Sequence, residues 1–256
     1  MPSIERLERP IYNACMNPKI DLSAVILCYK AGEYAPVFVE KMKKALVAEN
    51  LTYELVLVAN YHDQKSDKTP DIVRRMAAED PSIVAVARKK EGMMGWDMRS
   101  GLDAASGRVV GLIDGDGQMP PEDIVKVYKK LKEGNYDMAK TYRDERYDGF
   151  FRIALSRIYN ALLRLLFPAV KVKDANSKPK IFTYDALKKL KLASDDWFID
   201  AEIVIQASLL KFRIGEVPTI FYENELRESF VKFPAIFQFI KNLLVYRFKI
   251  WFAQWH

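Results

Sequence analysis

Short runs of apolar residues alternate with longer helical patterns through the first half of the chain. The runs SAVILCY, YELVLVA, SIVAVA and RVVGLID are continuous stretches of apolar residues, which is typical of strands covered on both faces. Helical patterns at about residues 37–49 and 69–79 follow the first two runs. Strand, helix and strand in succession indicate parallel strands joined by crossover helices, so the sequence predicts an α/β fold.

The order of elements changes after residue 120. The pattern predicts a helix at about residues 121–133, a strand at about 136–141 and a long amphipathic helix through FFRIALSRIYNALLRLLF. This mixed order indicates a second half built onto the same sheet. We find no internal repeat, low-complexity tract or Gly/Ser linker, so we expect both halves to form one compact body.

Composition excludes several classes of protein. Half of the 256 residues are hydrophobic, which is enough for a large core. The two cysteines, Cys15 and Cys28, have no metal-ligand spacing, and two histidines leave little material for a zinc site. We therefore expect a reduced, cytoplasmic protein without a zinc centre.

Neither end of the chain predicts an export signal or a membrane span. The N-terminal MPSIERLERPIYNA carries charges where a signal peptide needs a continuous apolar segment. The most apolar stretch, 234–255, is interrupted by Lys241, Arg247 and Lys249, which a lipid-spanning helix tolerates poorly.

Positive charge is concentrated in one segment. The net charge of the chain is +6, yet residues 140–191 hold 13 Lys/Arg against 5 Asp/Glu, a difference of +8. This segment either faces an anion or forms a solvated helical face. We expect no nucleic-acid partner, because the basic stretch carries no recognisable nucleic-acid-binding motif.

Two aspartates follow the fourth predicted strand. In an extended segment Asp114 and Asp116 project to the same side, with Gly115 between them. Such a pair suits one hard cation, Mg²⁺ or Mn²⁺. A calcium loop is excluded because Gln118 and Val125 stand where it needs acids. An aspartyl phosphatase would place the pair after its first strand. A turn in which Asp and Gly serve only as turn formers remains an alternative.

The segment IDGDGQMPPEDI resembles the D-x-D-x-Q-x-P-P-E segment of family 2 inverting glycosyltransferases, in particular the dolichyl-phosphate mannose synthase group, which acts on polyprenyl phosphates. AVILCYKAGEY, EGMMGWDMRSGLDAASGRVVGLID and DDWFIDAEIVIQASLLKFRIGEVPTIFYENELRES add to the similarity, which covers roughly residues 21–230. The resemblance implies a GT-A fold, a Rossmann-like mixed sheet flanked by helices with a C-terminal aromatic and basic helical tail.

The same resemblance implies a division of the chain. Residues 1–20 would be an N-terminal extension, 21–118 the nucleotide-sugar-binding half, 119–226 the acceptor-binding half of the same compact domain, and 227–256 a C-terminal amphipathic tail.

On the donor side, the resemblance implies that a divalent ion and, through it, the diphosphate of a GDP- or UDP-linked sugar are bound by Asp114, Asp116 and Gln118. Other residues would lie near the base, the nucleoside or the nucleotide phosphates. They are Tyr29, Glu33, Asn60, Arg227 and Ser229.

On the acceptor side, Arg143 and the helix pattern R-x3-S-x3-N at Arg152, Ser156 and Asn160 resemble the family's pattern. Positions 152, 156 and 160 share one helix face, so the three side chains form a plausible phosphate cradle. An exposed polar stripe opposite apolar residues is the alternative reading.

A later turn carries further matches. Asp174, Ser177 and Lys180 resemble a D-x2-S-G-x-R/K turn, in which Lys180 would bind the acceptor phosphate. Asp200 and Glu202 resemble an acidic pair of which one member lies near the acceptor. Acids in the first turn of a helix also stabilise its positive end, and both readings stay open.

The sequence departs from the family pattern at two places. Ala59 and Asn60 stand where two aspartates are common, and Lys178 replaces the usual glycine of the turn. A degenerate relative that binds a ligand or partner without turnover is therefore one alternative to an active enzyme.

The implied reaction is a single displacement at the anomeric carbon with inversion, carried by Asp116, Arg143 and Asp200. A polyprenyl phosphate acceptor arrives largely ionised and needs no strong base. A sugar hydroxyl acceptor, the other alternative, requires a base, and Asp200 is the first candidate. The basic, aromatic tail at residues 230–256 suggests a peripheral contact with a membrane surface, or a cover for the protein's own core or a dimer partner.

Overall fold

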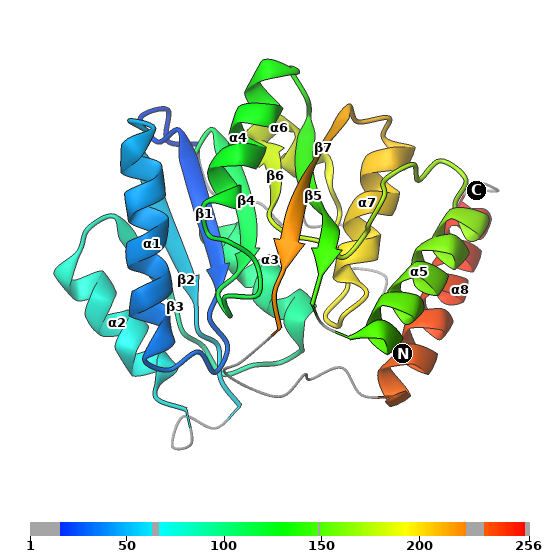
Figure 1. Cartoon of the computed structure of the whole chain (residues 1–256), viewed down its shortest axis with the longest axis horizontal. Coiled ribbons are helices and arrows are strands. Elements are labelled where there is room, and N and C mark those ends of the chain that lie inside the picture. The colour runs from blue at the N-terminus through cyan, green and yellow to red at the C-terminus, as the bar shows by residue number, and fades with distance from the viewer. Residues whose placement is uncertain (1–15, 63–66, 148, 224–232, 254–256) are drawn as a thin grey trace.

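A seven-stranded mixed sheet lies between two layers of helices in the computed structural model, which describes residues 16–62, 67–147, 149–223 and 233–253 (Figure 1). The strands are β1 (Leu22–Leu27), β2 (Tyr53–Val58), β3 (Ile83–Val86), β4 (Val109–Asp114), β5 (Met138–Arg146), β6 (Lys180–Thr183) and β7 (Ile214–Phe221). The helices are α1 (Tyr34–Ala48), α2 (Thr69–Glu79), α3 (Met94–Ala104), α4 (Asp123–Glu133), α5 (Phe150–Leu166), α6 (Tyr184–Lys189), α7 (Ile199–Leu209) and α8 (Phe233–Ala253).

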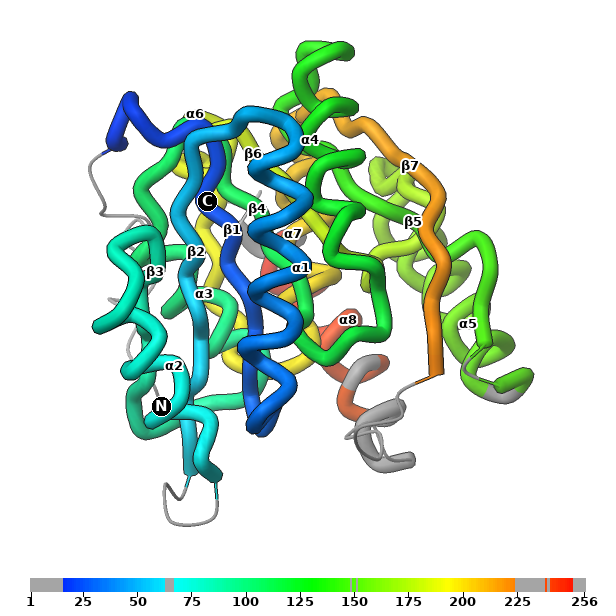
Figure 2. Tube along the Cα trace, turned by 60° about the vertical axis from the view of Figure 1, so that its left-hand side comes forward, coloured from blue at the N-terminus to red at the C-terminus, as the bar shows by residue number. Residues whose placement is uncertain are grey.

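The strand order is β3-β2-β1-β4-β6-β5-β7. Strands β3, β2, β1 and β4 are parallel, as the continuous apolar runs predicted. Strand β6 is inserted antiparallel between β4 and β5, and β7 runs parallel to β5. Figure 2 shows the sheet from its side, with α1 in front and β5 and β7 at the far edge from β3. The predicted mixed sheet flanked by helices is confirmed.

The carboxyl ends of the central strands are level with one another. Leu27 of β1 is in register with Val58 of β2 and with Asp114 of β4. The loops that follow these three strands therefore meet at one edge of the sheet, the lower edge in Figure 1. Open α/β sheets bind ligands at this edge.

Helices cover both faces of the sheet because the central strands are apolar throughout. All six residues of β1 are buried. The helices α1 and α4 pack over one face, while α3, α6 and α7 pack over the other (Figure 1). At Gly101 of α3, an added Cβ would lie 2.4 Å from the Val25 side chain of β1. Glycine thus permits α3 to approach the sheet closely.

Helices α5 and α8 contact each other beside the sheet and its two layers of helices (Figure 1). Among the described residues, no helix is long and apolar enough to cross a lipid bilayer.

Several predicted boundaries hold and others shift. Helix α2 begins and ends where the pattern placed it. Helix α4 begins at Asp123, two residues later than expected, and β5 extends to Arg146 beyond the predicted 136–141.

Candidate active site

The aspartate pair lies at the carboxyl edge of the sheet. Asp114 is the last residue of β4, where the Gly115 amide donates to the Leu27 carbonyl at 3.0 Å. The expectation that both aspartates share one extended segment is wrong, because the strand ends at Asp114 and Asp116 lies in a turn. In this turn Gly117 has φ +77°, and the Gln118 amide donates to Asp116 Oδ1 at 3.2 Å. Both carboxylates remain half-buried, which leaves them accessible to a ligand.

Gln118 connects the motif to the end of the sheet's last strand. Its side-chain Nε2 donates to the carbonyl of Tyr222 at 3.2 Å, and the Tyr222 amide donates to the Gln118 carbonyl at 2.8 Å. The side-chain bond uses the amide nitrogen, so the amide oxygen, the atom a metal would need, makes neither of these two bonds.

Lys178 lies between the motif and α7. Its Nζ donates to Asp114 Oδ2 at 3.2 Å and to Asp200 Oδ2 at 3.1 Å, and the lysine side chain is only 3% exposed. Burial would lower the pKa of Lys178, but the two carboxylates outweigh it and raise the pKa. The lysine that replaces a glycine in the family's turn is thus a buried cation that joins two candidate site acids.

Asp200 is enclosed by two ammonium groups. Lys178 bonds one carboxylate oxygen, Lys180 bonds the other, and all three side chains are buried. Burial alone would raise the pKa of Asp200, but the two lysines outweigh it and lower the pKa. A carboxylate held in this way is a weak proton acceptor. Glu202, its neighbour in the sequence pattern, bonds the backbone amides of Ala193 and Ser194 and supports that loop.

Arg143 is fixed by a carboxylate and touches α5. Its Nε lies 2.6 Å from Asp174 Oδ2, one terminal nitrogen lies 2.9 Å from Asp174 Oδ1, and the same nitrogen donates to Ser156 Oγ at 3.3 Å. Burial alone would raise the pKa of Asp174, yet Arg143 outweighs it and holds that pKa well below its usual range. The structure therefore brings together Arg143 and Ser156, as the sequence predicted, and adds Asp174 as their support.

The polar face of α5 turns toward the protein. Asn160 donates to the Ser156 carbonyl at 2.8 Å and accepts from the Ala175 amide at 2.9 Å, while Ile158 and Leu165 are 65% and 75% exposed. The alternative reading of an exposed polar stripe is wrong at Asn160, which is buried. Arg152, one turn before Ser156, is half-buried.

Asn60 connects the end of β2 to neighbouring segments through hydrogen bonds of its side chain. Its amide nitrogen donates to Asp97 Oδ1 at 3.0 Å and to Ser100 Oγ at 2.9 Å, and its oxygen accepts from the Arg88 amide at 2.9 Å. The side chain is fully buried. A direct contact between Asn60 and a donor nucleotide stays a prediction.

Sequence reasoning missed a buried ion pair next to Tyr29. Lys90 Nζ pairs with Asp97, and the same Nζ lies 4.0 Å from the centroid of the Tyr29 ring. Burial is the main cause of a raised pKa at Asp97. Lys90 stands in a charged loop that gives no periodic signal, so only the fold brings it to Tyr29. Glu33, which precedes α1, is exposed.

The described residues supply few ligands for a metal ion. Within them, no group of three or more His, Cys, Asp or Glu is arranged to hold one. Asp114, Asp116 and the amide oxygen of Gln118 are nevertheless hard oxygen donors, and Mg²⁺ or Mn²⁺ takes the rest of its shell from water and phosphate. The residues present therefore fit such an ion. Arg227 and Ser229 lie outside the described residues.

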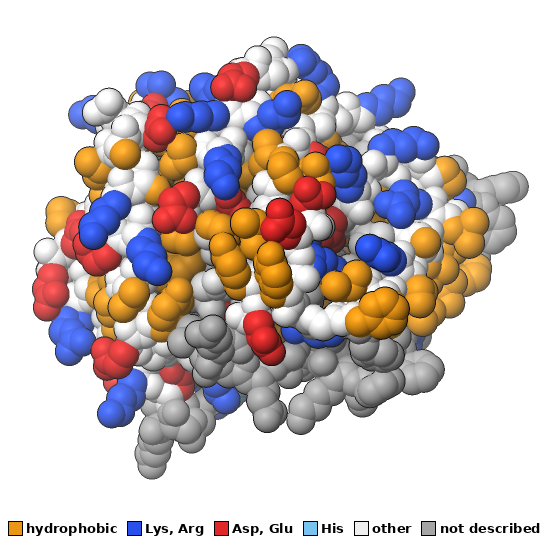
Figure 3. All heavy atoms as spheres, viewed as in Figure 1, with side chains coloured by type: hydrophobic (Ala, Val, Ile, Leu, Met, Phe, Trp, Pro, Cys, Tyr) orange, Lys and Arg blue, Asp and Glu red, His pale blue; other side chains and the backbone are white. Residues whose placement is uncertain are grey.

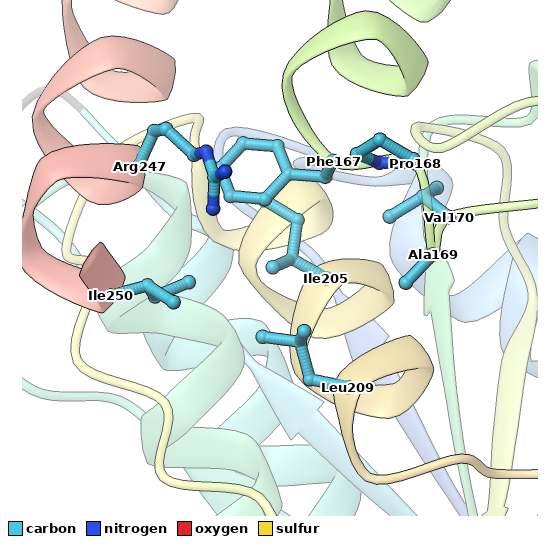
Figure 4. Close-up of a pocket in the computed structure, with 8 residues that line it drawn as sticks. All are labelled: Phe167, Pro168, Ala169, Val170, Ile205, Leu209, Arg247 and Ile250. Atoms are coloured by element: carbon cyan, nitrogen blue, oxygen red, sulfur yellow. The ribbon is translucent and has the colours of Figure 1, made fainter. Parts of the chain in front are cut away.

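A small cavity of about 60 Å³ lies apart from the candidate site residues described above (Figure 4). It follows the C-terminal end of α5, whereas Arg152 and Ser156 lie near the N-terminal end. The cavity is lined by Phe167, Pro168, Ala169, Val170, Ile205, Leu209, Arg247 and Ile250.

Comparison with known proteins places the chain among sugar transferases. It is 32% identical over 151 residues to the undecaprenyl-phosphate 4-deoxy-4-formamido-L-arabinose transferase of Serratia proteamaculans (strain 568), covering 58% of this chain and 45% of that protein. It is 27% identical over 230 residues to the dodecaprenyl-phosphate galacturonate synthase of Rhizobium johnstonii, covering 88% of this chain and 66% of that one. The chain thus spans about half the length of the first of these relatives.

Solved structures agree with the fold. Glucosyl-3-phosphoglycerate synthase from Mycobacterium tuberculosis, crystallised with Mn²⁺, UDP and glucosyl-3-phosphoglycerate, superimposes with a TM-score of 0.64 at 15% identity, covering 89% of this chain and 80% of that one. The sequence model of Glycosyl transferase family 2 matches residues 23–194, more than half of the chain. The chain therefore belongs to glycosyl transferase family 2, as the motif at Asp114 predicted.

Proposed function

We propose that this protein is an inverting glycosyltransferase that moves a sugar from a nucleotide-diphosphate sugar to a polyprenyl phosphate. The observation that carries the proposal is the juxtaposition of two accessible carboxylates, Asp114 and Asp116, with a buried cluster of cations that begins at Lys178. Carboxylates of this kind suit a metal-bound diphosphate, and cations suit a phosphate acceptor. The names of the two relatives support a polyprenyl phosphate as the acceptor.

On the donor side, Asp114, Asp116 and Gln118 would hold Mg²⁺ or Mn²⁺. A divalent ion, when bound, neutralises the charge that develops on a departing nucleoside diphosphate. The solved relative that contains Mn²⁺ and UDP supports this assignment. Tyr29, at the end of β1, would lie beside the base, and either UDP or GDP fits this reading.

On the acceptor side, Arg143 and Ser156 would orient the phosphate, with Arg152 and Asn160 on the same helix. A phosphate monoester has a second pKa of about 6, so its oxygen is already an anionic nucleophile at neutral pH. Asp200, with both oxygens bonded to lysines, is poorly placed to act as a base. This favours a phosphate acceptor over a sugar hydroxyl, because only the hydroxyl needs its proton removed.

The outer face of α5 and α8 would contact the membrane that holds such an acceptor. Figure 3 shows hydrophobic side chains gathered at the right-hand edge, where Figure 1 places these helices. The exposed apolar residues there are Phe150, Ile158, Leu165, Ile240, Leu244, Val245 and Phe248. Exposed cations on the same helices are Arg157, Arg164, Lys241, Arg247 and Lys249. Apolar and basic groups together suit an anionic lipid surface.

Vesicle flotation tests this contact. With vesicles containing phosphatidylglycerol, the wild type should float, and a Phe150→Ser, Leu165→Ser double variant should remain at the bottom. The control is Val37→Ser with Val47→Ser, two exposed apolar residues on α1. Equal flotation of both double variants would exclude α5 as the membrane contact.

A transfer assay tests the proposed function as a whole. Labelled UDP- and GDP-sugars are incubated with Mn²⁺, the wild type and vesicles containing undecaprenyl phosphate, and label in the lipid fraction is counted. We expect one donor to give a labelled lipid, and Asp116→Asn to lower the rate by about 100-fold, the effect of losing one strong charge-stabilising group. Glu133→Gln, an exposed acid at the far end of α4, serves as the control. Label in no lipid fraction with any donor would overturn the proposal.

A further inference from the structure

Two exposed tyrosine rings stack on each other at the carboxyl edge of the sheet. Tyr147 follows β5 and Tyr222 follows β7, and the carboxyl ends of these paired strands lie side by side at the lower edge in Figure 1. The ring centroids are 6.4 Å apart, and the ring planes differ by 11°. The residues are 59% and 44% exposed, and no other tyrosine in the described part of the chain is exposed. The two rings form an aromatic surface open to solvent, which we call the tyrosine platform.

Backbone hydrogen bonds fix the chain at both rings. The Tyr147 amide donates to the Phe221 carbonyl at 2.9 Å, and the Tyr222 amide donates to the Gln118 carbonyl at 2.8 Å. The Gln118 side chain also donates to the Tyr222 carbonyl at 3.2 Å. The tyrosine platform is therefore attached directly to the motif of the candidate donor site. A ligand would meet a preformed surface there, which lowers the entropy cost of binding.

Two arginines lie next to the tyrosine platform. The guanidinium carbon of Arg143 lies 5.1 Å from the centroid of the Phe221 ring, and that of Arg146 lies 5.8 Å from it. Phe221 directly precedes Tyr222 in the chain. Arg143 also contacts Ser156 at 3.3 Å, in the pair proposed for the acceptor phosphate. Cations beside an exposed apolar surface match an amphiphile, which has an anionic head group and an apolar chain.

The exposed aromatic surface continues onto α5. Phe150 is the first residue of this helix, follows Tyr147 closely in the chain and is 84% exposed. Ser156 lies further along the same helix, about 9 Å from Phe150 at a rise of about 1.5 Å per residue. An apolar chain attached to a phosphate at Ser156 would therefore meet exposed aromatic residues as it leaves the site.

The sugar of the donor is the competing occupant, because sugar rings also stack on aromatic side chains. A sugar in transfer has to be shielded from water, which would otherwise accept it. Rings as exposed as Tyr147 and Tyr222 do not provide such a shield. Their exposure fits a chain that runs out of the site toward the lipid.

We propose that the tyrosine platform binds the prenyl chain of the acceptor, at the isoprene units next to its phosphate. The proposal rests on the proposed function, in which Arg143 and Ser156 orient this phosphate. The rings supply affinity because they remove apolar surface of the chain from water. The enzyme thus recognises what is attached to the phosphate as well as the phosphate itself.

Calorimetric titration with geranyl phosphate and ethyl phosphate tests the proposal without a donor or a membrane. Both are water-soluble and share the head group, but only geranyl phosphate carries a prenyl chain. We expect the wild type to bind geranyl phosphate at least about tenfold more tightly than ethyl phosphate. Tyr147→Ser combined with Tyr222→Ser should weaken geranyl phosphate binding by about tenfold or more. Equal binding to this serine variant, or no binding to the wild type, would overturn the proposal.

Two control variants separate a lost ring contact from a lost fold. Tyr147→Phe combined with Tyr222→Phe keeps both rings, so its affinity for geranyl phosphate should stay within about twofold of the wild type. Val37→Ser combined with Val47→Ser changes two exposed apolar residues on α1 and should also leave the affinity unchanged. A loss in the phenylalanine variant as large as that in the serine variant would contradict a ring contact.

Transfer kinetics and vesicle flotation identify the other occupants. With undecaprenyl phosphate in vesicles, the serine variant should raise the KM for the lipid by about tenfold or more and leave the KM for the nucleotide sugar unchanged. A rise in the KM for the nucleotide sugar alone would assign the platform to the sugar. Lost flotation with unchanged geranyl phosphate affinity would assign it to the bilayer surface. Either result would overturn the proposal. Absence of transfer with every donor would instead count against the proposed function, while the geranyl phosphate titrations would still decide the role of the platform.

Discussion

Asp200 accepts a hydrogen bond from Lys178 at 3.1 Å through one carboxylate oxygen, and its other oxygen is taken by Lys180. The cluster is buried, so its charges depend on one another far more than a surface pair would. Asp200 also stands in the first turn of α7, the position where an acid stabilises a helix. The stability of variants separates these two roles.

Asp200→Asn should destabilise the protein by about 3 kcal/mol, because it leaves two buried ammonium groups without their shared carboxylate. Urea unfolding followed by circular dichroism measures this loss. Asp185→Asn is the control, since Asp185 occupies the first turn of α6 but is exposed. Its loss should stay below about 1 kcal/mol, the size of a helix-dipole effect. Equal losses of stability in the two variants would mean that Asp200 only stabilises the first turn of its helix.

Replacing Lys180 should restore part of the stability that is lost when Asp200 is replaced. We expect Asp200→Asn combined with Lys180→Met to be more stable than Asp200→Asn alone, by about 1 kcal/mol or more, since residues in one ion network couple by that amount. A double-mutant cycle from the same urea curves gives the coupling. Strict additivity of the two single changes would show that the two side chains do not interact.

Arg143→Lys should weaken acceptor use more than donor use. Lysine cannot keep both bonds to Asp174 and the contact with Ser156, because its ammonium group lacks the planar fork of arginine. We expect the KM for the lipid phosphate to rise by about tenfold or more, the equivalent of one lost charge-assisted hydrogen bond. The KM for the nucleotide sugar should stay unchanged. Arg74→Lys on the exposed side of α2 is the control. A rise in the donor KM alone would place Arg143 in the other half of the site.

Much of the fold and part of the site could be predicted from the sequence. The parallel strands were readable because their apolar runs are continuous, as in β1 and β4. The short strand β6 was not, because its sequence KIFT begins with Lys180, a residue that looks exposed and is fully buried. Only its pairing with Asp200, distant along the chain, explains that burial.

The candidate site, like the fold, could be predicted from the sequence only in part. The spacing of Asp114 and Asp116 indicated a cation site, since local sequence fixes a strand end and a turn. In the sequence, Lys178 was visible only as a replacement of the glycine in the family's turn. Its role could not be predicted, because its partners Asp114 and Asp200 come from β4 and α7. The Lys90 contact with Tyr29 also needs the three-dimensional arrangement of two separate loops. Pairings between distant segments carry no periodic signal in the sequence.

Lys140 should make stability depend on pH. Burial lowers the pKa of Lys140 to about 7, and nearby Lys180 acts in the same direction. Above that pH the folded protein has lost a proton that the unfolded chain keeps until about pH 10.4, so unfolding takes up a proton and stability rises with pH. Relative to Lys140→Met, the wild type should gain about 1 kcal/mol per pH unit between roughly pH 7 and 9. Parallel stability curves over this range would mean that Lys140 remains charged in the fold.

Cys28 should be unreactive in the folded protein. Burial raises the pKa of the Cys28 thiol to about 12, and the side chain lies at the end of β1 beneath the candidate donor site. In a Cys15→Ser background, labelling with a thiol reagent at pH 8 should be at least about 100-fold slower in the native state than in urea, since only the thiolate reacts. Rapid labelling of the native protein would show that this edge of the sheet opens.

Calorimetric titration of UDP and GDP, each with Mn²⁺, into the wild type and Asp116→Asn tests the central claim most directly. We expect one nucleotide to bind the wild type and Asp116→Asn to weaken that binding by about tenfold or more, because the carboxylate that holds the ion is lost. Glu133→Gln should bind like the wild type. Absence of binding to the wild type, or equal binding to Asp116→Asn, would contradict a nucleotide-sugar site at the carboxyl end of β4.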